Sequence, residues 1–448
     1  MATTTTTTDT IPGTAEDGAA KRAAGGAFAG FFVDMFDVYL PIVALAPAAA
    51  YFKADDVSVA TAGLIATIIF VATLIGRPIG ALIFGHFADK VGRRRIAMLS
   101  VGGFGVVTLM IAFLPGYQQI GITAIVLLIV LRFIDGIFLG GEYTAASPLA
   151  MEQAPKEKRG LYGALIMTGF PLAYVAISML TLVMLQVAPA GGIDSPYVQW
   201  GWRIPFVIGA LLAFGFVFFY ARSVEESKVF EESTDKTKNP LKELFSGDTR
   251  RDFFQVFVLM SGLWLTLYMV TAVLPGLLTS EVGLSSTAKT ATVLVANVVL
   301  AIAYVGAGVL SQRIGRRTLY RAAGLIAAVV GSLLYGIVVN LTTGDLLWVV
   351  LLTILINVVV VSGWGAITTY INERFHTGVR SSGFGLGYSL AVVLPSFYGF
   401  YQGALGEFMP ARYTPLVLLV IGGLLMTVGA QMGPETKDVD MQAAPVRV

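Results

Sequence analysis

The chain has 448 residues, of which 56% are hydrophobic and 13% are charged, and its mean hydropathy is +0.77. An ordinary soluble protein has about 25% charged residues, so the composition excludes a soluble enzyme, a nucleic-acid binder and a disordered protein. With no cysteine and two histidines, we expect no disulfide, no metal site and no cofactor. The composition predicts a polytopic membrane protein in contact with lipid, all α-helical within the bilayer.

Twelve apolar stretches are long enough to cross a bilayer, which needs roughly 20 apolar residues per helix. The predicted spans are 27–50, 61–85, 96–114, 121–144, 161–187, 203–220, 253–278, 290–311, 319–341, 346–370, 382–406 and 413–432. Most lysines and arginines fall in the even-numbered connections and the termini. Because basic loops stay in the cytoplasm, we expect both termini there. We expect the membrane to be the cytoplasmic (inner) membrane of a bacterium, that is, its plasma membrane.

The only long polar stretch inside the chain separates six spans from six others. The two halves carry the same Gly-Arg-Arg motif at equivalent positions, since Gly92-Arg93-Arg94 follows span 2 and Gly315-Arg316-Arg317 follows span 8. Two six-helix halves in the same orientation indicate parallel repeats with a substrate site between them. The expected organisation is a disordered N-terminus 1–24, a first half 25–220, a central cytoplasmic loop 221–252, a second half 253–432 and a tail 433–448.

One loop motif and several shorter motifs carry a family resemblance. Residues 85–95, Gly85 to Arg95, satisfy every fixed position of the loop motif of the major facilitator superfamily. The chain is also similar to that family's metabolite:proton symporters, which carry proline/betaine, citrate, oxoglutarate and shikimate. The supporting residues are Asp34 to Asp37 with Tyr39, Arg77 to Gly80, Gly140 to Glu142, Glu373 to Phe375, Val379-Arg380, Gly387-Tyr388 and Pro434 to Lys437. The resemblance implies the major facilitator fold and transport by alternating access.

Six ionisable residues lie inside predicted spans of the first half, and each is a candidate because a charge at bilayer depth costs at least ~2.5–3.5 kcal/mol. The proton-coupling candidates are Asp34, Asp37, Arg132, Asp135 and Glu142. The sixth, Arg77, could instead pair with an acid of span 1 or span 4, or bind a carboxylate. Arg132 and Asp135 are three residues apart, so they can form an ion pair that a proton would open. A static structural pair remains an alternative, as does a gate or anchor role for Glu142.

Polar and aromatic residues of the central spans are candidates for contact with a substrate. They are Tyr39, Arg77, Tyr268, Asn297, Asn357, Trp364, Tyr388 and Gln402. An aromatic cage would accept a quaternary ammonium, and a carboxylate would be held by Arg77 or Arg132. Singly, most of these residues are equally compatible with a core position.

The loop motif suggests a cytoplasmic gate. The family resemblance implies that Asp89 faces the start of span 11, where a helix N-terminus favours a carboxylate. The gate candidates are Gly85, Asp89, Gly92, Arg93, Arg94, Ser381 and Ser382.

The leading hypothesis is a proton-coupled symporter of a small polar metabolite, with an organic acid favoured, acting as a monomer. We expect that the protein is not an enzyme and that it has no nucleic-acid partner. A proton-linked exporter, a sugar-type facilitator and a receptor that binds without flux remain alternatives. An ATP-driven pump is disfavoured, because the sequence has no Walker-type loop.

Overall fold

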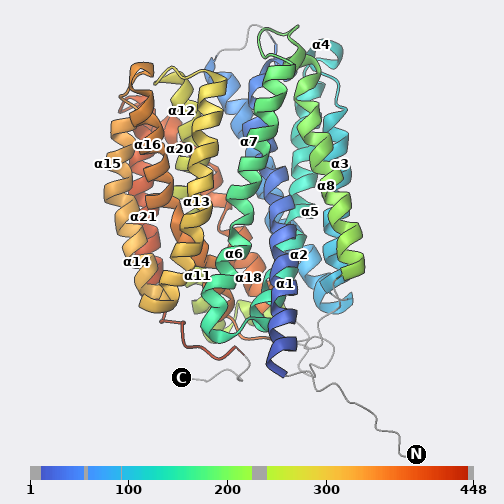
Figure 1. The fold of residues 1–448 in the computed structure, drawn as a ribbon, viewed down its shortest axis with the longest axis vertical. Coiled ribbons are helices and arrows are strands. Elements are labelled where there is room, and N and C mark those ends of the chain that lie inside the picture. The colour runs from blue at the N-terminus through green and yellow to red at the C-terminus, as the bar shows by residue number, and fades with distance from the viewer. Residues whose placement is uncertain (1–11, 55–58, 92, 224–239, 442–448) are drawn as a thin grey trace, which may run out of the picture.

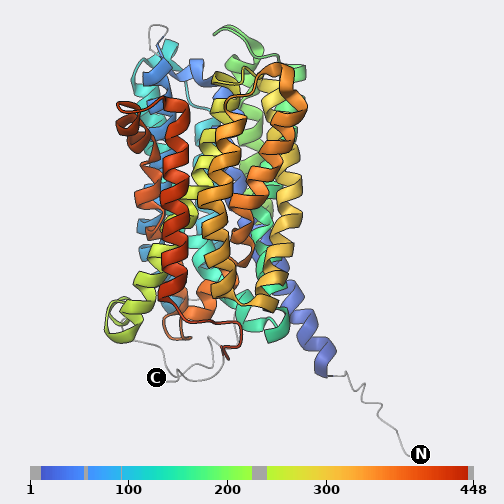
Figure 2. The same ribbon diagram turned by 90° about the vertical axis from the view of Figure 1, so that its left-hand side faces the viewer.

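The computed structural model describes residues 12–54, 59–91, 93–223 and 240–441. Its described part is built from helices, and twelve of them are long and apolar enough to cross a membrane. The prediction of an all-α protein with twelve membrane helices is confirmed. Figure 1 shows the helices side by side, with the first half from blue to green and the second from yellow to red. Figure 2 shows the second half from the side.

The helices of the first half run mostly without a break. They are α1 (Pro12–Leu40), α2 (Val59–Val91), α3 (Arg93–Ala112), α5 (Thr123–Gln153), α6 (Arg159–Met167) with α7 (Gly169–Val187), and α8 (Arg203–Ser223), with a short α4 (Tyr117–Ile120) between α3 and α5. A π-helical turn and a 3-10 segment continue α1 to Phe52.

The helices of the second half are interrupted more often. After the short α10 (Pro240–Leu244), the spans are α11 (Gly247–Tyr268) with α12 (Leu274–Ser280), α13 (Ser286–Ile314), α14 (Arg316–Ile326) with α15 (Ser332–Val338), α16 (Leu346–Ile356) with α17 (Ile367–Arg374), α18 (Arg380–Leu390) with α19 (Val393–Ser396) and α20 (Tyr398–Gly406), and α21 (Thr414–Met432). Interrupted helices at membrane depth are typical of helices that line a site.

Two expected boundaries are corrected. The expected disorder of residues 1–24 is wrong for 12–24, because α1 begins at Pro12 and this alanine-rich segment, of high helix propensity, extends it. The expected loop 221–252 is shorter, since α8 continues to Ser223 and α11 begins at Gly247. Residues 1–11 and 224–239 lie outside the described part.

Helix α1 begins and helix α21 ends at the same end of the bundle (Figures 1 and 2). We call it the basic end, because it carries Arg94, Lys156, Lys158, Arg316 and Arg374. The opposite end carries the turn at Lys53 and the start of α13. Between the halves, α13 packs on α6 and α7, and α18 packs on α2 and α5.

Helices α2 and α5 approach closely along two interlocked pairs of glycines. A Cβ placed on Gly136 would lie 1.9 Å from the Thr73 carbonyl oxygen, and one on Gly80 would lie 1.8 Å from that of Ile137. Gly76 and Gly140 meet backbone atoms of the facing helix in the same way. Small residues at such a crossing let the two backbones touch. This contact sets the position of Arg77 against α5.

Replacing Gly136 by alanine should therefore destabilise the protein. Overpacking of this kind costs about 1–3 kcal/mol, so we expect a lower midpoint of thermal unfolding in detergent. Gly306→Ala is the matched control, because Gly306 is an exposed helical glycine with no atom within 4 Å of an added Cβ. Equal midpoints for the two variants would contradict the close approach.

Candidate functional site

Two arginines and four acids form a buried cluster among the central helices of the first half. The Arg77 guanidinium donates two hydrogen bonds to Asp34, Nη1 to Oδ1 and Nη2 to Oδ2, both at 2.9 Å. Arg77 is 2% exposed and Asp34 is fully buried. A two-bond arginine–carboxylate pair is geometrically specific. The pair joins α1 to α2. The sequence left open whether Arg77 pairs with an acid of span 1 or of span 4, and the structure shows the acid of span 1.

Arg132 is shared by two carboxylates. Its Nη1 lies 2.9 Å from Asp37 Oδ2 and 2.9 Å from Asp135 Oδ2, and its Nη2 donates to the Asp37 carbonyl oxygen at 3.3 Å. Thr108 of α3 donates a further hydrogen bond to Asp37. The predicted Arg132–Asp135 contact is present, but Asp37 competes for the same nitrogen. Asp37 is the better anchored acid, because neither Asp135 oxygen has a hydrogen bond.

Glu142 is a buried acid without a base of its own. It is 1% exposed, and neither carboxylate oxygen has a hydrogen-bond partner in the described structure. Its carboxyl group packs on Gly30, where an added Cβ would lie 2.0 Å from Glu142 Oε1. Gly30 precedes Asp34 by one helical turn, so Glu142 faces the same side of α1 as the Asp34–Arg77 pair.

A layer of aromatic rings fills the space between the halves next to this cluster. The Tyr39 ring centre lies 6.1 Å from that of Phe70, and Phe70 lies 5.6 Å from Tyr268 of the second half. Tyr143 contacts Tyr388 at 4.8 Å, and Trp264 lies 4.6 Å from Trp364. Tyr39 Oη and Thr271 Oγ1 are 3.5 Å apart across the seam. These rings pack across the seam between the two halves.

The second half contributes neutral polar groups that have no partner. The buried atoms without a hydrogen bond in the described structure include Tyr268 Oη, Tyr304 Oη, Trp364 Nε1 and Asn297 Oδ1. A buried polar group without a partner costs about 1–3 kcal/mol. Such a set of donors and acceptors fits a polar ligand that would satisfy them. Around the central cluster, the first half thus supplies charged groups and the second half neutral hydrogen-bonding groups.

A cavity of about 370 Å³ opens between the halves toward the end opposite the basic end. We call it the vestibule. It is lined by Pro41, Ile42, Leu45, Ala46, Ala49, Phe52, Lys53, Ile65, Thr67, Ile69, Phe70, Ala272, Val273, Pro275, Gly276, Lys289, Tyr398 and Gln402. Phe70 and Tyr398, which both pack on Tyr268, connect the vestibule to the aromatic layer. Its volume is within the range of small-molecule sites.

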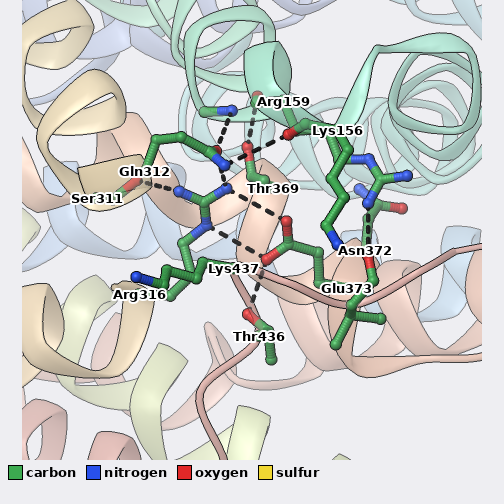
Figure 3. A network of polar contacts seen from close by, with 12 residues as sticks. Lys156, Arg159, Ser311, Gln312, Arg316, Thr369, Asn372, Glu373, Thr436 and Lys437 are labelled. Atoms are coloured by element: carbon green, nitrogen blue, oxygen red, sulfur yellow. Dashed lines mark hydrogen bonds and ion pairs between the residues drawn. The ribbon is translucent and has the colours of Figure 1, made fainter. Parts of the chain in front are cut away.

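The basic end is closed by polar contacts between the halves. Tyr143 Oη and Thr368 Oγ1 are 2.7 Å apart, and Arg380 Nη1 lies 2.6 Å from Glu152 Oε1. Figure 3 shows another contact between the halves, in which Gln312 donates to the Lys156 carbonyl, beside an ion pair within the second half, Arg316 with Glu373 at 3.2 Å. These contacts block passage at the basic end while the vestibule lies open at the other.

The segment after α21 reinforces this closure. Glu435 accepts hydrogen bonds from the backbone N–H groups of Arg316 at 2.7 Å and Arg317 at 3.1 Å, at the N-terminus of α14. Thr436 donates to Glu373, also drawn in Figure 3. Arg159 of the first half donates to the Val439 carbonyl at 2.8 Å. The residues from 433 to 441 therefore cross the basic end and contact both halves.

The structure places the predicted substrate residues at different depths. Gln402 lines the vestibule, while Tyr39, Tyr268, Trp364 and Tyr388 belong to the aromatic layer. Arg77 is held by Asp34. Asn297 and Asn357 are buried, and each amide donates to a carbonyl one turn earlier in its own helix.

The structure describes only some residues of the predicted gate. Gly85, Ser381 and Ser382 are buried, and α18, which carries both serines, packs on α2. The side chains of Asp89 and Arg93, and Gly92, lie outside the described residues. Arg94 donates to the Ala221 carbonyl of α8. The Asp89 contact stays a prediction.

Several residues of the site were missed by the sequence reasoning. Thr108, Trp264, Glu152 and Gln312 are ordinary polar or aromatic residues within apolar helices, and no local pattern distinguishes them. Lys53 and Lys289 carried a signal, because they are rare bases in the odd-numbered connections.

Comparisons with known proteins agree with this architecture. The family model of the Major Facilitator Superfamily matches residues 27–400. The Escherichia coli (strain K12) shikimate transporter is 29% identical over 91% of this chain and 93% of its own length. The alpha-ketoglutarate permease of that strain is 30% identical over 82% of each chain, and its proline/betaine transporter is 27% identical over 91% of this chain and 83% of its own.

Among solved structures, the proton:xylose symporter XylE superposes with a TM-score of 0.73 at 16% identity, covering 94% of this chain and 97% of its own. At this identity the likeness concerns the fold alone. The twelve membrane helices and the family match over most of the chain give one conclusion. The chain belongs to the major facilitator superfamily, whose members are membrane transporters and not enzymes.

Proposed function

We propose that this transporter is a proton-coupled symporter that imports a small polar metabolite, of the organic-acid class, by alternating access. One observation carries the proposal. The Arg132 guanidinium is shared by Asp37 and Asp135 inside a buried cluster that also holds the unpaired Glu142. The related transporters of shikimate, alpha-ketoglutarate and proline/betaine support the substrate class.

The charge balance of the cluster favours proton binding. Four carboxylates against two guanidiniums leave two negative charges in excess when every acid is ionised. Uncompensated charges in a low-dielectric site are very costly, and binding a proton removes one. Asp135 and Glu142 are the acids best placed to take it, because their oxygens have no hydrogen bonds.

The shared guanidinium supplies a way to couple proton and substrate. When Asp135 is ionised, Arg132 is held between two carboxylates, 2.9 Å from each. Protonation of Asp135 removes one attraction and leaves Arg132 with Asp37 alone. The freed hydrogen-bonding capacity of Arg132 can then bind a substrate carboxylate. Substrate and proton would thus favour the same state.

The direction of the two ends follows from the charge rule. Because basic loops remain in the cytoplasm, we assign the basic end, with both termini, to the cytoplasm of a bacterial inner membrane. The open vestibule and the closed basic end then describe an outward-facing state. The contacts within one chain suffice to form the cluster and the seam, so we propose that the monomer transports.

The test is transport in proteoliposomes with a panel of radiolabelled citrate, oxoglutarate, shikimate, benzoate-type acids, proline, betaine and hexoses. We expect one class of compound to accumulate when the inside is alkaline, and to exchange by counterflow without a gradient. Exchange with no response to pH would instead indicate a facilitator. Drug resistance on overexpression, without uptake, would favour the proton-linked exporter.

Asp135→Asn should separate coupling from substrate movement. The amide keeps the shape of the acid but binds no proton, so we expect pH-driven accumulation to be lost while counterflow survives. One proton per substrate allows up to roughly tenfold accumulation per pH unit, which sets the size of the loss. Asp194→Asn, at an exposed acid, is the control. Unchanged pH-driven accumulation in Asp135→Asn would exclude Asp135 from coupling and leave a static ion pair.

Glu142→Gln tests the other buried acid whose oxygens have no hydrogen bond. A glutamine matches the protonated form in shape, so we expect normal expression and thermal stability but reduced pH-driven accumulation. Glu407→Gln, at an exposed glutamate, serves as the control. Full accumulation in Glu142→Gln would assign Glu142 to a gate or anchor and remove it from the proton path.

Asp89→Asn tests the gate expected from the loop motif. A carboxylate at a helix N-terminus contributes about 0.3–1 kcal/mol, and losing it should weaken the closed cytoplasmic side. We expect lower uptake at unchanged surface expression. Normal uptake by a well-expressed variant would reject this contact.

A further inference from the structure

The vestibule carries positive charge without a compensating acid in its wall. Of its eighteen lining residues, the charged ones are Lys53, which lies between α1 and α2, and Lys289, which lies in the first turn of α13. They come from opposite halves of the molecule. Both side chains are half-buried. The described acids at this end, Asp194, Glu281, Asp345 and Glu407, are not among the lining residues.

Neither lysine forms an ion pair with a described residue. The salt bridges of the described chain join other bases, such as Arg77, Arg132 and Arg380. The two ammonium groups are therefore not neutralised by a direct partner in the described structure. A cleft of one sign of charge with apolar walls raises the local concentration of oppositely charged solutes.

The remaining wall shows what kind of anion would fit. Most of it is aliphatic or aromatic, and its polar groups besides the lysines are Thr67, Tyr398 and Gln402. Phe70 and Tyr398 lie at its inner side against Tyr268. Such a wall accepts a compact organic body with one or two carboxylates better than an inorganic ion.

We infer that the vestibule is an entry site selective for organic anions, in which Lys53 and Lys289 attract the carboxylate of the substrate before it reaches the central cluster. The inference rests on the proposed transport of a small polar metabolite and narrows it to carboxylates with net negative charge. It assigns the lysines to selection at entry and leaves proton coupling to the buried acids.

The first experiment measures the potential in the vestibule and needs no substrate. Because the chain has no cysteine, single cysteines can be placed at Ala46 or Gly276, which are exposed and line the vestibule on opposite halves. The rates of modification by anionic sulfonatoethyl and cationic trimethylammonioethyl methanethiosulfonate are then compared. Their ratio reports the net charge around the vestibule, whichever residues carry it.

We expect the anionic-to-cationic rate ratio, normalised to a small free thiol, to fall roughly three- to tenfold in Lys53→Gln/Lys289→Gln at low salt. The difference should shrink at high salt. Lys53→Arg/Lys289→Arg keeps the charge and should keep the ratio. A cysteine at the remote, exposed Gly192 should show no change. An equal ratio with and without the lysines overturns the inference.

The second experiment tests selection during counterflow without a pH gradient, so that a failure of proton coupling does not affect it. Shikimate and 2-oxoglutarate are the anionic probes, and betaine is the zwitterionic probe. We expect the double glutamine variant to raise the apparent KM for the anions roughly fivefold at low salt and to leave betaine exchange unchanged. Equal losses for anions and betaine, or exchange of betaine alone, overturn the inference.

Discussion

The sharing of one buried guanidinium by two carboxylates is the contact around which the first half is arranged. Arg132 reaches Asp37 only because α1 lies against α5, and Thr108 of α3 completes the site by donating to Asp37. The glycines of α2 and α5 set Arg77 against α5, and α5 packs on α1, which carries Asp34. A buried ion pair adds little net stability, but removing one partner is costly. The cluster therefore specifies the packing of four helices and at the same time keeps titratable groups inside the membrane.

The sequence predicted the parts of this arrangement that depend on one helix at a time. Apolar length predicted the twelve spans, and a spacing of three residues predicted the Arg132–Asp135 contact. The sequence could not predict that Arg77 pairs with Asp34 or that Asp37 is the second partner of Arg132, because both contacts depend on how separate helices cross. The helical extension over 12–24 was missed because a polar composition hid a run of strong helix formers. Trp264 could not be distinguished from a core residue, since its contacts with Trp364 and Tyr388 depend on the break between α16 and α17 and on the packing of α11 against α18.

The two halves share a fold but contribute different groups to the central site. The first half has long helices and holds the buried charges of the central cluster, which need a rigid frame to stay paired. The second half has interrupted spans, and Thr271, Asn357, Trp364 and Tyr398 lie at or beside the interruptions. Broken helices can change shape locally at a lower cost than continuous ones. A substrate bound at the seam would therefore meet fixed charge on one side and adjustable hydrogen-bonding groups on the other.

Helix α5 links the proton site to the closure of the basic end. It carries Arg132, Asp135 and Glu142 in the cluster, then Tyr143, whose hydroxyl contacts Thr368 across the seam, and finally Glu152, which pairs with Arg380. Glu142 and Tyr143 are consecutive, so a change in the packing of Glu142 against Gly30 moves the backbone that positions the Tyr143 contact. A shift of α5 relative to the second half would strain the Tyr143–Thr368 and Glu152–Arg380 contacts together. In the proposed mechanism, protonation in the cluster and opening at the basic end would thus act on the same rigid element, which is a physical route for coupling without any direct contact between proton and gate.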